Sequence, residues 1–263
     1  MKYELLNIHN PEYGAERMCT YDDLYAGGNQ FMKNIRKYLQ GRHSEPSEIY
    51  DERIARAFYF GYIGSIIDFY GSALFSKQPE VNVDDSNTGE RIQLEGFWKI
   101  FLEDCDLNGN HFQAFWLDRF LQALIHRRSF ALIDFPEAGY GIEPSSKAEE
   151  RALGLDRAFL VPVNAYEVID WQYNDRDELD WIMIHYAHID RLGLENSRDT
   201  VVEEWTYISH TEYRMFRAER KLTGRGARER GFRPADEIPE VISRSLAYFP
   251  VVEIRVPEGL WIM

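Results

Sequence analysis

An apolar stretch near the start of the chain, residues 48–76, does most to limit the folds that this sequence can adopt. Apolar side chains recur along it at helical spacing, at Ile54, Ala57, Phe58, Tyr62, Ile66, Phe69, Tyr70 and Ala73, and others fill the opposite side, at Phe60, Ile63, Ile67 and Leu74. A helix that is apolar on most faces is buried on most faces. We therefore expect one long buried helix over this stretch. Its expected core residues are Phe58, Tyr62, Ile66 and Phe69.

Two arrangements account for a helix of this kind. It is either the central core helix of a monomer, or a helix whose second face is covered by another subunit. Three glycines within it, Gly61, Gly64 and Gly71, each cost about 1 kcal/mol of helix stability relative to alanine, and they permit neighbouring backbones to approach closely. The sequence alone slightly favours the core helix of a monomer.

The composition is that of a globular protein with a sizeable core. The chain has 263 residues, of which 44% are hydrophobic and 28% charged, and a formal net charge of −14. No apolar run reaches the roughly 18–20 residues of a membrane span, and the first residues lack the pattern of a signal peptide. Cys19 and Cys105 are far apart and lack metal-binding spacing, so we expect reduced thiols in an intracellular protein. The acidic charge argues against a general nucleic-acid coat.

The hydrophobic period changes along the chain near residue 159. Before this point, residues 97–133 repeat apolar side chains at helical spacings of three and four, whereas β-branched and aromatic runs with turn signals follow it. This change predicts an α+β fold, with a helical N-terminal half that contains the long buried helix, followed by an antiparallel β meander of about four or five strands. The expected parts are an N-terminal arm over 1–30, a mainly helical part over 31–158 and a β-rich part over 159–263.

Residues 104–115 (DCDLNGNHFQAF) resemble a calcium-binding EF-hand loop. The first ligand positions of such a loop are matched by Asp104, Asp106, Asn108 and Gly109. The last position needs a glutamate that binds calcium through both oxygens, and Phe115 stands there. We therefore interpret the segment as a glycine turn that leads into the next helix, and we predict that it does not bind calcium.

No other motif indicates catalysis or cofactor binding. His185 and His188 could share a metal on a helix, but on a strand they point to opposite faces. His126 is expected at a helix C-terminus, where the helix dipole favours positive charge. The sequence contains no GxSxG, Walker A, Rossmann or HExxH motif. We therefore predict that the chain is not an enzyme and has no catalytic, cofactor-binding or metal-binding residue.

Residues 214–233 carry a local excess of positive charge. They hold eight basic and two acidic residues, a net charge of +6 in a chain whose total is −14. The basic residues are Arg214, Arg217, Arg220, Lys221, Arg225, Arg228, Arg230 and Arg233. Such a segment is more often a solvated hairpin tip or loop. The alternative is a set of contacts to phosphate or to an acidic surface of a neighbouring subunit.

Several segments together resemble the portal proteins of tailed bacteriophages in order and spacing. In that family a long helix with a Tyr-x-x-Arg motif ends in Leu-Phe-x-Lys-x-Pro. An Asp-x-x-Gly turn into a helix follows, then a strand that ends in Asp-x-Pro, and then a strand with Ile and Trp. In this chain the matching residues are Tyr50, Arg53, Leu74, Phe75, Lys77, Pro79, Asp106, Gly109, Asp134, Pro136, Ile169 and Trp171. The Ile–Trp spacing is one residue shorter here than in the family, and the resemblance covers about residues 20–260.

The resemblance implies a homo-oligomeric ring, usually of twelve subunits, at one vertex of the virion capsid. Double-stranded DNA would pass through its channel during genome packaging and ejection, driven by a separate terminase motor. The major capsid protein and a head–tail adaptor would be further partners, and the ring would be assembled in the host cytoplasm without cofactor, active site or membrane contact. This chain would supply the wing, because portals of this group continue beyond the position equivalent to Met263 into stem and clip.

Two other functions fit the residues. One is a soluble α+β bacterial enzyme or ligand-binding protein with a pocket built from Trp171, Trp181 and Trp205. The other is a different phage head or neck component, which would share oligomerisation but not the series of wing motifs. The mass of the particle in solution separates an enzyme, expected as a monomer or dimer, from a ring.

Overall fold

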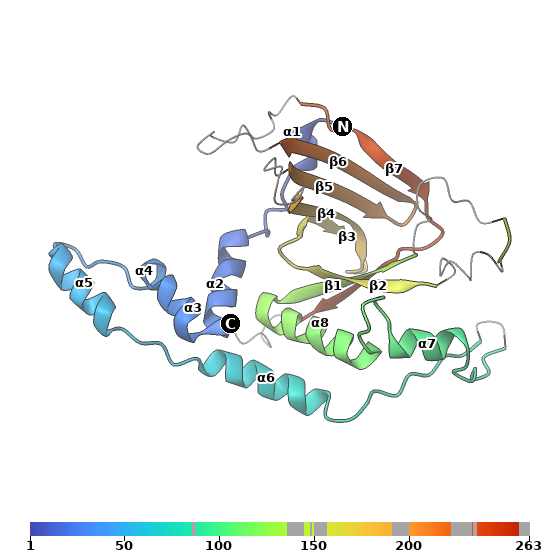
Figure 1. Cartoon of the computed structure of the whole chain (residues 1–263), viewed down its shortest axis with the longest axis horizontal. Coiled ribbons are helices and arrows are strands. Elements are labelled where there is room, and N and C mark those ends of the chain that lie inside the picture. Colours follow the sequence, from blue (N-terminus) through green and yellow to red (C-terminus); the bar gives the residue numbers. More distant parts are fainter. Residues whose placement is uncertain are drawn as a thin grey trace, which may run out of the picture. The chain divides into compact units, whose positions relative to one another are not determined.

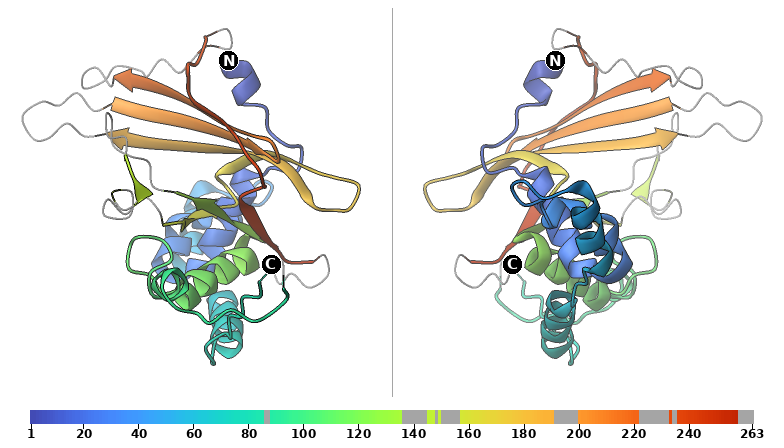
Figure 2. Two further views of the ribbon diagram at one scale, coloured as in Figure 1. Left: turned by 90° about the vertical axis from the view of Figure 1, so that its right-hand side faces the viewer. Right: turned by 90° about the vertical axis from the view of Figure 1, so that its left-hand side faces the viewer.

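The chain divides into two compact units (Figures 1 and 2). The computed structural model describes residues 1–85, 88–135, 145–147, 149, 157–190, 200–221, 233 and 236–257. The β unit consists of Met1–Gly14 and Val163–Val251, and the helical unit of Ala15–Pro162 and Val252–Met263. The predicted α+β class, with a β meander in the C-terminal part, is confirmed.

The β unit contains an antiparallel meander of five strands that follow one another in sequence order (Figure 1). The strands are β3 (Val168–Tyr173), β4 (Leu179–Asp190), β5 (Thr200–Ser209), β6 (Glu212–Lys221) and β7 (Glu240–Ser245). Their β-branched and aromatic residues suit a pleated surface that is buried in the centre. Trp205 of β5 lies opposite Phe216 of β6, and both are almost fully buried.

The first residues of the chain belong to this β unit. The short helix α1 (Tyr3–Leu6) packs on one face of the sheet, and the backbone beside it is held at two points. The amino group of Met1 donates a hydrogen bond of 2.9 Å to the carbonyl of Ile238, and the N–H of Tyr3 donates one of 2.8 Å to the carbonyl of Asp236. The core cluster at this face is formed by Leu6, Ile169, Trp205, Phe216, Ala218 and Ile238.

The helical unit combines helices with a three-stranded sheet of order β2-β1-β8. Its helices are α2 (Ala15–Ala26), α3 (Gly28–Lys33), α4 (Ile35–Tyr38), α5 (Ser47–Arg56), α6 (Tyr62–Leu74), α7 (Phe97–Glu103) and α8 (Phe112–His126), and its strands are β1 (Arg128–Asp134), β2 (Phe159–Asn164) and β8 (Val251–Arg255). One core cluster forms around Ile67, Ala123, Leu124, Ile125 and Val256, and another around Cys105, Phe115, Ala131 and Leu160.

The structure groups the chain differently from the three parts expected from the sequence. The expected arm, 1–30, is divided between the units at Gly14, and its second half forms α2 and the start of α3. The β-rich unit begins at Val163 rather than at residue 159, and residues 252–263 belong to the helical unit. The described helices contain none that is long and apolar enough to cross a membrane.

The prediction of one long helix over 48–76 is wrong, because α5 ends at Arg56 and α6 begins at Tyr62. The chain turns to extended backbone at Ala57, where ψ is 146°. Tyr59 holds this connection in place. Its hydroxyl donates a hydrogen bond of 3.0 Å to the carbonyl of Leu24, and its ring stacks on Phe31 with the ring centroids 4.1 Å apart. These contacts require an extended connection in place of a continuous helix.

Candidate subunit interface

Helix α6 packs on its own unit through two glycines and one isoleucine. Gly64, Ile67 and Gly71 are its buried positions. A Cβ atom at Gly64 would lie 2.5 Å from the carbonyl oxygen of Tyr25 in α2, and one at Gly71 would lie 2.7 Å from Cδ2 of Leu121 in α8. The glycines therefore let α2 and α8 approach the backbone of α6 closely.

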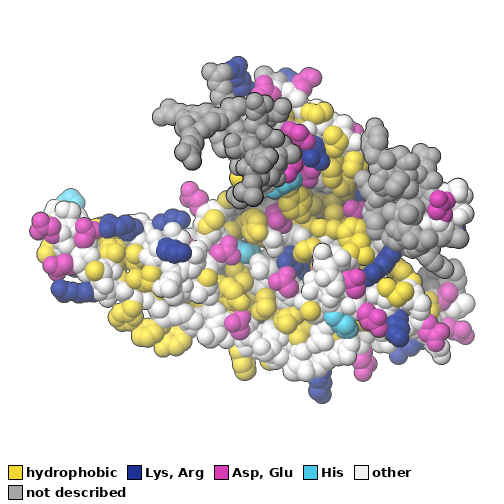
Figure 3. Space-filling model, in the orientation of Figure 1, with side chains coloured by type: hydrophobic (Ala, Val, Ile, Leu, Met, Phe, Trp, Pro, Cys, Tyr) yellow, Lys and Arg dark blue, Asp and Glu magenta, His cyan; other side chains and the backbone are white. Residues whose placement is uncertain are grey.

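The large side chains of this segment point to solvent. The exposed residues, which we call the aromatic surface, are Phe58, Phe60, Tyr62, Ile66, Phe69, Tyr70 and Leu74. Their exposed fractions run from 42% to 74%. The predicted burial of Phe58, Tyr62, Ile66 and Phe69 is therefore wrong. The helical stripe that the sequence predicts does exist, but it lies opposite the glycine face and is exposed. Figure 3 shows apolar side chains at the surface of the chain.

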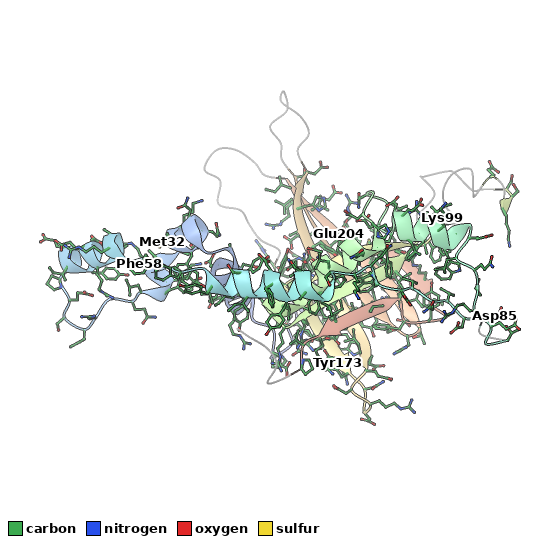
Figure 4. The ribbon with its side chains drawn as sticks, turned by 90° about the horizontal axis from the view of Figure 1, so that it is seen from below. Met32, Phe58, Asp85, Lys99, Tyr173 and Glu204 are labelled. Carbon is green, nitrogen blue, oxygen red and sulfur yellow. The ribbon has the colours of Figure 1, made fainter. Side chains whose placement is uncertain are left out.

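The connection between α5 and α6 extends the aromatic surface. Its side chains alternate, as they do in extended backbone. Tyr59 contacts Leu24 and Phe31, whereas Phe58, labelled in Figure 4, and Phe60 are exposed. The rings of Phe58 and Phe60 meet edge to face at 5.0 Å, and Phe60 stacks with Tyr62 at 5.7 Å. These rings form a continuous ladder that leads onto α6.

The aromatic surface is uncharged and large. Asp68 is the one charged residue in α6, and it accepts a hydrogen bond of 2.7 Å from the hydroxyl of Tyr25, whose pKa rises to about 12 through burial and this bond. A whole aromatic side chain buries about 150–250 Å², so the exposed fractions amount to roughly 700 Å². The largest apolar patch on a typical monomer is about 300–600 Å². One partner in a standard protein interface buries about 800 Å².

The first two arginines of the predicted basic segment are paired within the sheet. Arg214 on β6 forms an ion pair with Glu240 on β7, and this hydrogen bond lowers the pKa of Glu240. Arg217 lies 3.5 Å from Glu204 on β5 and 3.2 Å from Glu219. These contacts make both arginines cross-strand partners in the meander and reduce the charge they offer to a ligand.

The rest of the basic segment divides into described and undescribed residues. Arg220 forms an ion pair with Glu203 on β5, whose carboxylate is almost fully buried. Lys221 is the last residue of β6, and the backbone N–H of Arg233 donates a hydrogen bond of 2.7 Å to Asp236. The remaining predicted contacts, Arg225, Arg228 and Arg230, lie outside the described residues.

The three tryptophans of the alternative pocket do not lie together. Trp171 is paired with Ile182 on β4, whereas Trp205 is paired with His185 on the same strand. Positions 182 and 185 are an odd number apart, so their side chains lie on opposite faces of the sheet. Trp181 shares the face of Trp205, and Trp205 is itself fully buried. These residues therefore do not line one common cavity.

The EF-hand-like turn uses its carboxylates to hold its own backbone. Asp106 accepts hydrogen bonds from the N–H groups of Asn108 and Asn110 at 3.0 and 3.2 Å. Burial raises the pKa of Asp106, but the hydrogen bonds from Asn110 and Asn108 outweigh it and keep that pKa below its ordinary value. Asp104 accepts the N–H of Gly109 at 2.9 Å and lies 3.1 Å from Arg157. This geometry explains the turn before α8 without a metal.

The two cysteines are free thiols, as expected from their separation in the sequence. Cys19 is exposed, and Cys105 is buried in the core of the helical unit. Burial raises the pKa of Cys105 to about 12, so this thiol stays protonated and is a poor nucleophile. Among the described residues, no group of three or more His, Cys, Asp or Glu side chains is arranged to hold a metal ion.

The aromatic surface is thus the feature of the described structure that most needs a partner. The sequence signal for this surface is the pair Gly64 and Gly71, since small residues at helical spacing mark the side on which α6 approaches its neighbours. Comparison with models of known protein families finds no match to this chain, and no curated protein matches it significantly.

Proposed function

We propose that this chain is a structural subunit of a bacteriophage portal ring at the capsid vertex, which serves as the conduit for genome packaging and ejection. The observation that carries the proposal is the inverted packing of α6, with glycines inward and the aromatic surface outward. This helix belongs to the same segment, residues 50–81, that opens the resemblance to portal proteins. A helix built in this way suits a subunit whose outer face is covered by another copy.

The size of the aromatic surface supports an assembled state. Contiguous apolar patches of several hundred Å² on a soluble protein mark interaction sites. Aromatic residues in particular are enriched at the centre of protein interfaces, where they supply most of the binding energy. A surface of roughly 700 Å² without a charge matches this description.

The Tyr-x-x-Arg motif of the resemblance makes contacts within the helical unit. Tyr50 lies beneath two arginines, with the guanidinium carbons of Arg36 and Arg53 at 5.3 and 5.4 Å from its ring centroid. Arg53 also donates hydrogen bonds of 2.8 Å to Glu45 and to the carbonyl of Gln40. The Tyr-x-x-Arg motif thereby fixes the start of α5 to the loop that precedes it.

The proposal includes the partners that the resemblance implies. These are further copies of the chain in a ring of twelve, the major capsid protein, the terminase motor, a head–tail adaptor and the double-stranded DNA in the channel. The ion pairs of β6 argue against Arg214, Arg217 and Arg220 as DNA contacts. The subunit requires no cofactor and performs no catalysis.

The proposal is tested by measuring the mass of the purified chain with light scattering. The parent chain should form a species many times heavier than 31.0 kDa. A Phe58→Ser/Phe69→Ser variant should remain a monomer with the circular dichroism of the parent, because it removes only exposed side chains. A matched control, Ile189→Ser/Val241→Ser, alters two residues of the β unit that are 52% and 51% exposed and should assemble normally. A parent chain that stays monomeric at high concentration contradicts the proposal.

A further inference from the structure

A second group of exposed apolar side chains lies on and beside α7. We call Ile92, Phe97 and Ile100 the α7 surface; they are 37%, 41% and 52% exposed. Elsewhere in the described part of the helical unit, large exposed apolar residues such as Ile49 and Phe135 stand apart from one another along the chain. The helical unit therefore has two apolar groups of several residues, the aromatic surface and the α7 surface.

The α7 surface rests on a rigid base. Phe97 stacks on Phe101 with the ring centroids 5.8 Å apart, and Phe101 contacts Phe112 of α8 at 6.1 Å. Phe112 in turn meets Trp116 at 5.9 Å, and Trp116 packs against the buried core at Phe115. An exposed ring that is held by a chain of rings loses little freedom when a partner covers it, and preorganisation of this kind favours binding.

The two surfaces belong to different elements of the helical unit. Figure 4 labels Phe58, which belongs to the aromatic surface, and Lys99 of α7, and these two residues lie well apart along the unit. Two separate apolar surfaces on one subunit allow a head-to-tail contact, in which one surface of a copy meets the other surface of the next copy. Contacts of this type generate closed rings when the rotation between copies closes.

We propose that the aromatic surface of one copy packs against the α7 surface of the next copy, head to tail. This inference rests on the proposed ring. A self-complementary contact between two aromatic surfaces would close a dimer and leave the α7 surface exposed, whereas a ring needs two different surfaces on every subunit. The α7 surface is the smaller of the two, so it meets the centre of the aromatic surface, and polar residues form the rim, as in standard interfaces.

Mixing two assembly-deficient variants tests the pairing. One variant, Phe58→Ser/Phe69→Ser, keeps only the α7 surface, and the other, Phe97→Ser/Ile100→Ser, keeps only the aromatic surface. Each alone should be a monomer, and an equal mixture should contain a species of two chains, because one functional contact remains and no further copy can be added. The circular dichroism of each variant should be that of the parent.

Each other outcome has a distinct meaning. If the Phe97→Ser/Ile100→Ser variant assembles as the parent does, the head-to-tail pairing is wrong and the proposed ring function stands. If both variants are monomers and their mixture is also monomeric, the two surfaces do not meet and the pairing is again wrong. If the parent itself is a monomer, the proposed function is overturned, and this inference with it.

Crosslinking gives a second readout that does not depend on loss of assembly. In a Cys19→Ser background, Phe58→Cys and Ile100→Cys together should yield a ladder of linked chains with a flexible bis-maleimide. Phe58→Cys alone should yield none, because in a head-to-tail contact this residue never meets its own counterpart. A linked dimer from Phe58→Cys alone would indicate a self-complementary contact and overturn the inference.

Discussion

Gly64 determines which side of α6 packs against its own unit. The atom that a Cβ would meet is the carbonyl oxygen of Tyr25, which belongs to the backbone and cannot rotate away. At Gly71 the nearest atom is the end of the Leu121 side chain, which can change its rotamer. A Cβ atom at either glycine would therefore lie too close to a neighbouring atom, but only at Gly64 is that atom part of the backbone.

We expect Gly64→Ala to lower the free energy of unfolding by up to about 2 kcal/mol, since overpacking costs about 1–3 kcal/mol and alanine regains only about 1 kcal/mol of helix propensity. Gly71→Ala should be close to neutral. Ser65→Ala, at an exposed position of the same helix, is the control and should stabilise slightly. Urea unfolding measures all three. Equal losses at Gly64 and Gly71 would contradict the assignment of the closest approach to Tyr25.

His185 is a residue whose charge the fold opposes. Its ring stacks on Trp205 with the centroids 4.9 Å apart, and its Nε2 lies 3.7 Å from Glu203. Burial lowers the pKa of His185 below its ordinary value of 6.5, and nearby His9 adds to this effect, although Glu203 opposes it. Glu203 also forms an ion pair with Arg220, so its negative charge already interacts with a guanidinium group.

The stability of the β unit should therefore decrease on acidification. The folded unit keeps His185 neutral, and the unfolded chain takes up a proton as the pH falls through 6.5. The contribution of this residue to stability is complete above pH 6.5 and is lost progressively below it. Urea unfolding followed by tryptophan fluorescence measures the free energy of unfolding at pH 8.0 and at pH 5.5. The His185→Gln substitution should reduce the difference between these two values. His188→Gln, at an exposed position of the same strand, should leave the difference unchanged.

At the scale of the element, side chains of the α5–α6 connection alternate between inward and exposed positions. A continuous helix would not place them in this way. Tyr59 is held by Leu24 and Phe31, whereas its neighbours Phe58 and Phe60 are exposed. Three aromatic residues in a row followed by glycine are compatible with a helix, and only the contacts of Tyr59 with other helices decide for an extended connection. The sequence alone does not contain that information.

Substitutions in this connection should alternate in their effect. Tyr59→Ala should cost about 2–4 kcal/mol, because it removes a ring stack and leaves the pocket between helices empty. Phe58→Ala should change the free energy of unfolding of the unassembled chain by no more than about 0.5 kcal/mol, since it alters an exposed side chain. Thermal unfolding at a concentration below assembly measures both. A large loss of unfolding free energy in Phe58→Ala would contradict the exposed position of Phe58 and favour the single buried helix.

The hydrophobic period predicted the type of each element better than it predicted which faces are buried. The strands that follow residue 159 form the expected meander. The stripe through Tyr62, Ile66 and Phe69 also exists, but it faces solvent in the single chain. A hydrophobic pattern states which side chains share a face, and it does not state whether that face meets the same chain or another one. The sequence likewise did not predict the ion pairs of β6, because cross-strand partners depend on the register between strands.

At the scale of the whole molecule, the net charge and the aromatic surface would act against each other in the proposed assembly. Each copy carries a net charge of −14, so copies repel, whereas the aromatic surface is uncharged. Salt screens repulsion between exposed charges and leaves apolar contacts in place. The alternative, in which Arg225, Arg228 and Arg230 bind an acidic patch of the next subunit, predicts the opposite dependence on salt.

We therefore expect assembly to strengthen as sodium chloride is raised from low to physiological concentration and beyond. Sedimentation velocity at a fixed protein concentration measures the assembled fraction. Replacing Arg225, Arg228 and Arg230 with Ser should leave this dependence in place if the aromatic surface drives assembly. Assembly that weakens with salt in the parent, and loses this weakening in the triple variant, would assign the contact to the basic segment.

The attachment of the first residues to the end of the sheet has a consequence for synthesis on the ribosome. Met1 and Tyr3 bond to Ile238 and Asp236, more than 230 residues later in the chain. Residues 1–3 are therefore among the last of the β unit to find their places, and this unit cannot close until Ile238 has emerged from the ribosome. Contacts of such high sequence separation slow folding. The helices of the helical unit lie within Ala15–Pro162, so they can form while the meander is still being translated, although β8 completes the sheet of this unit only later.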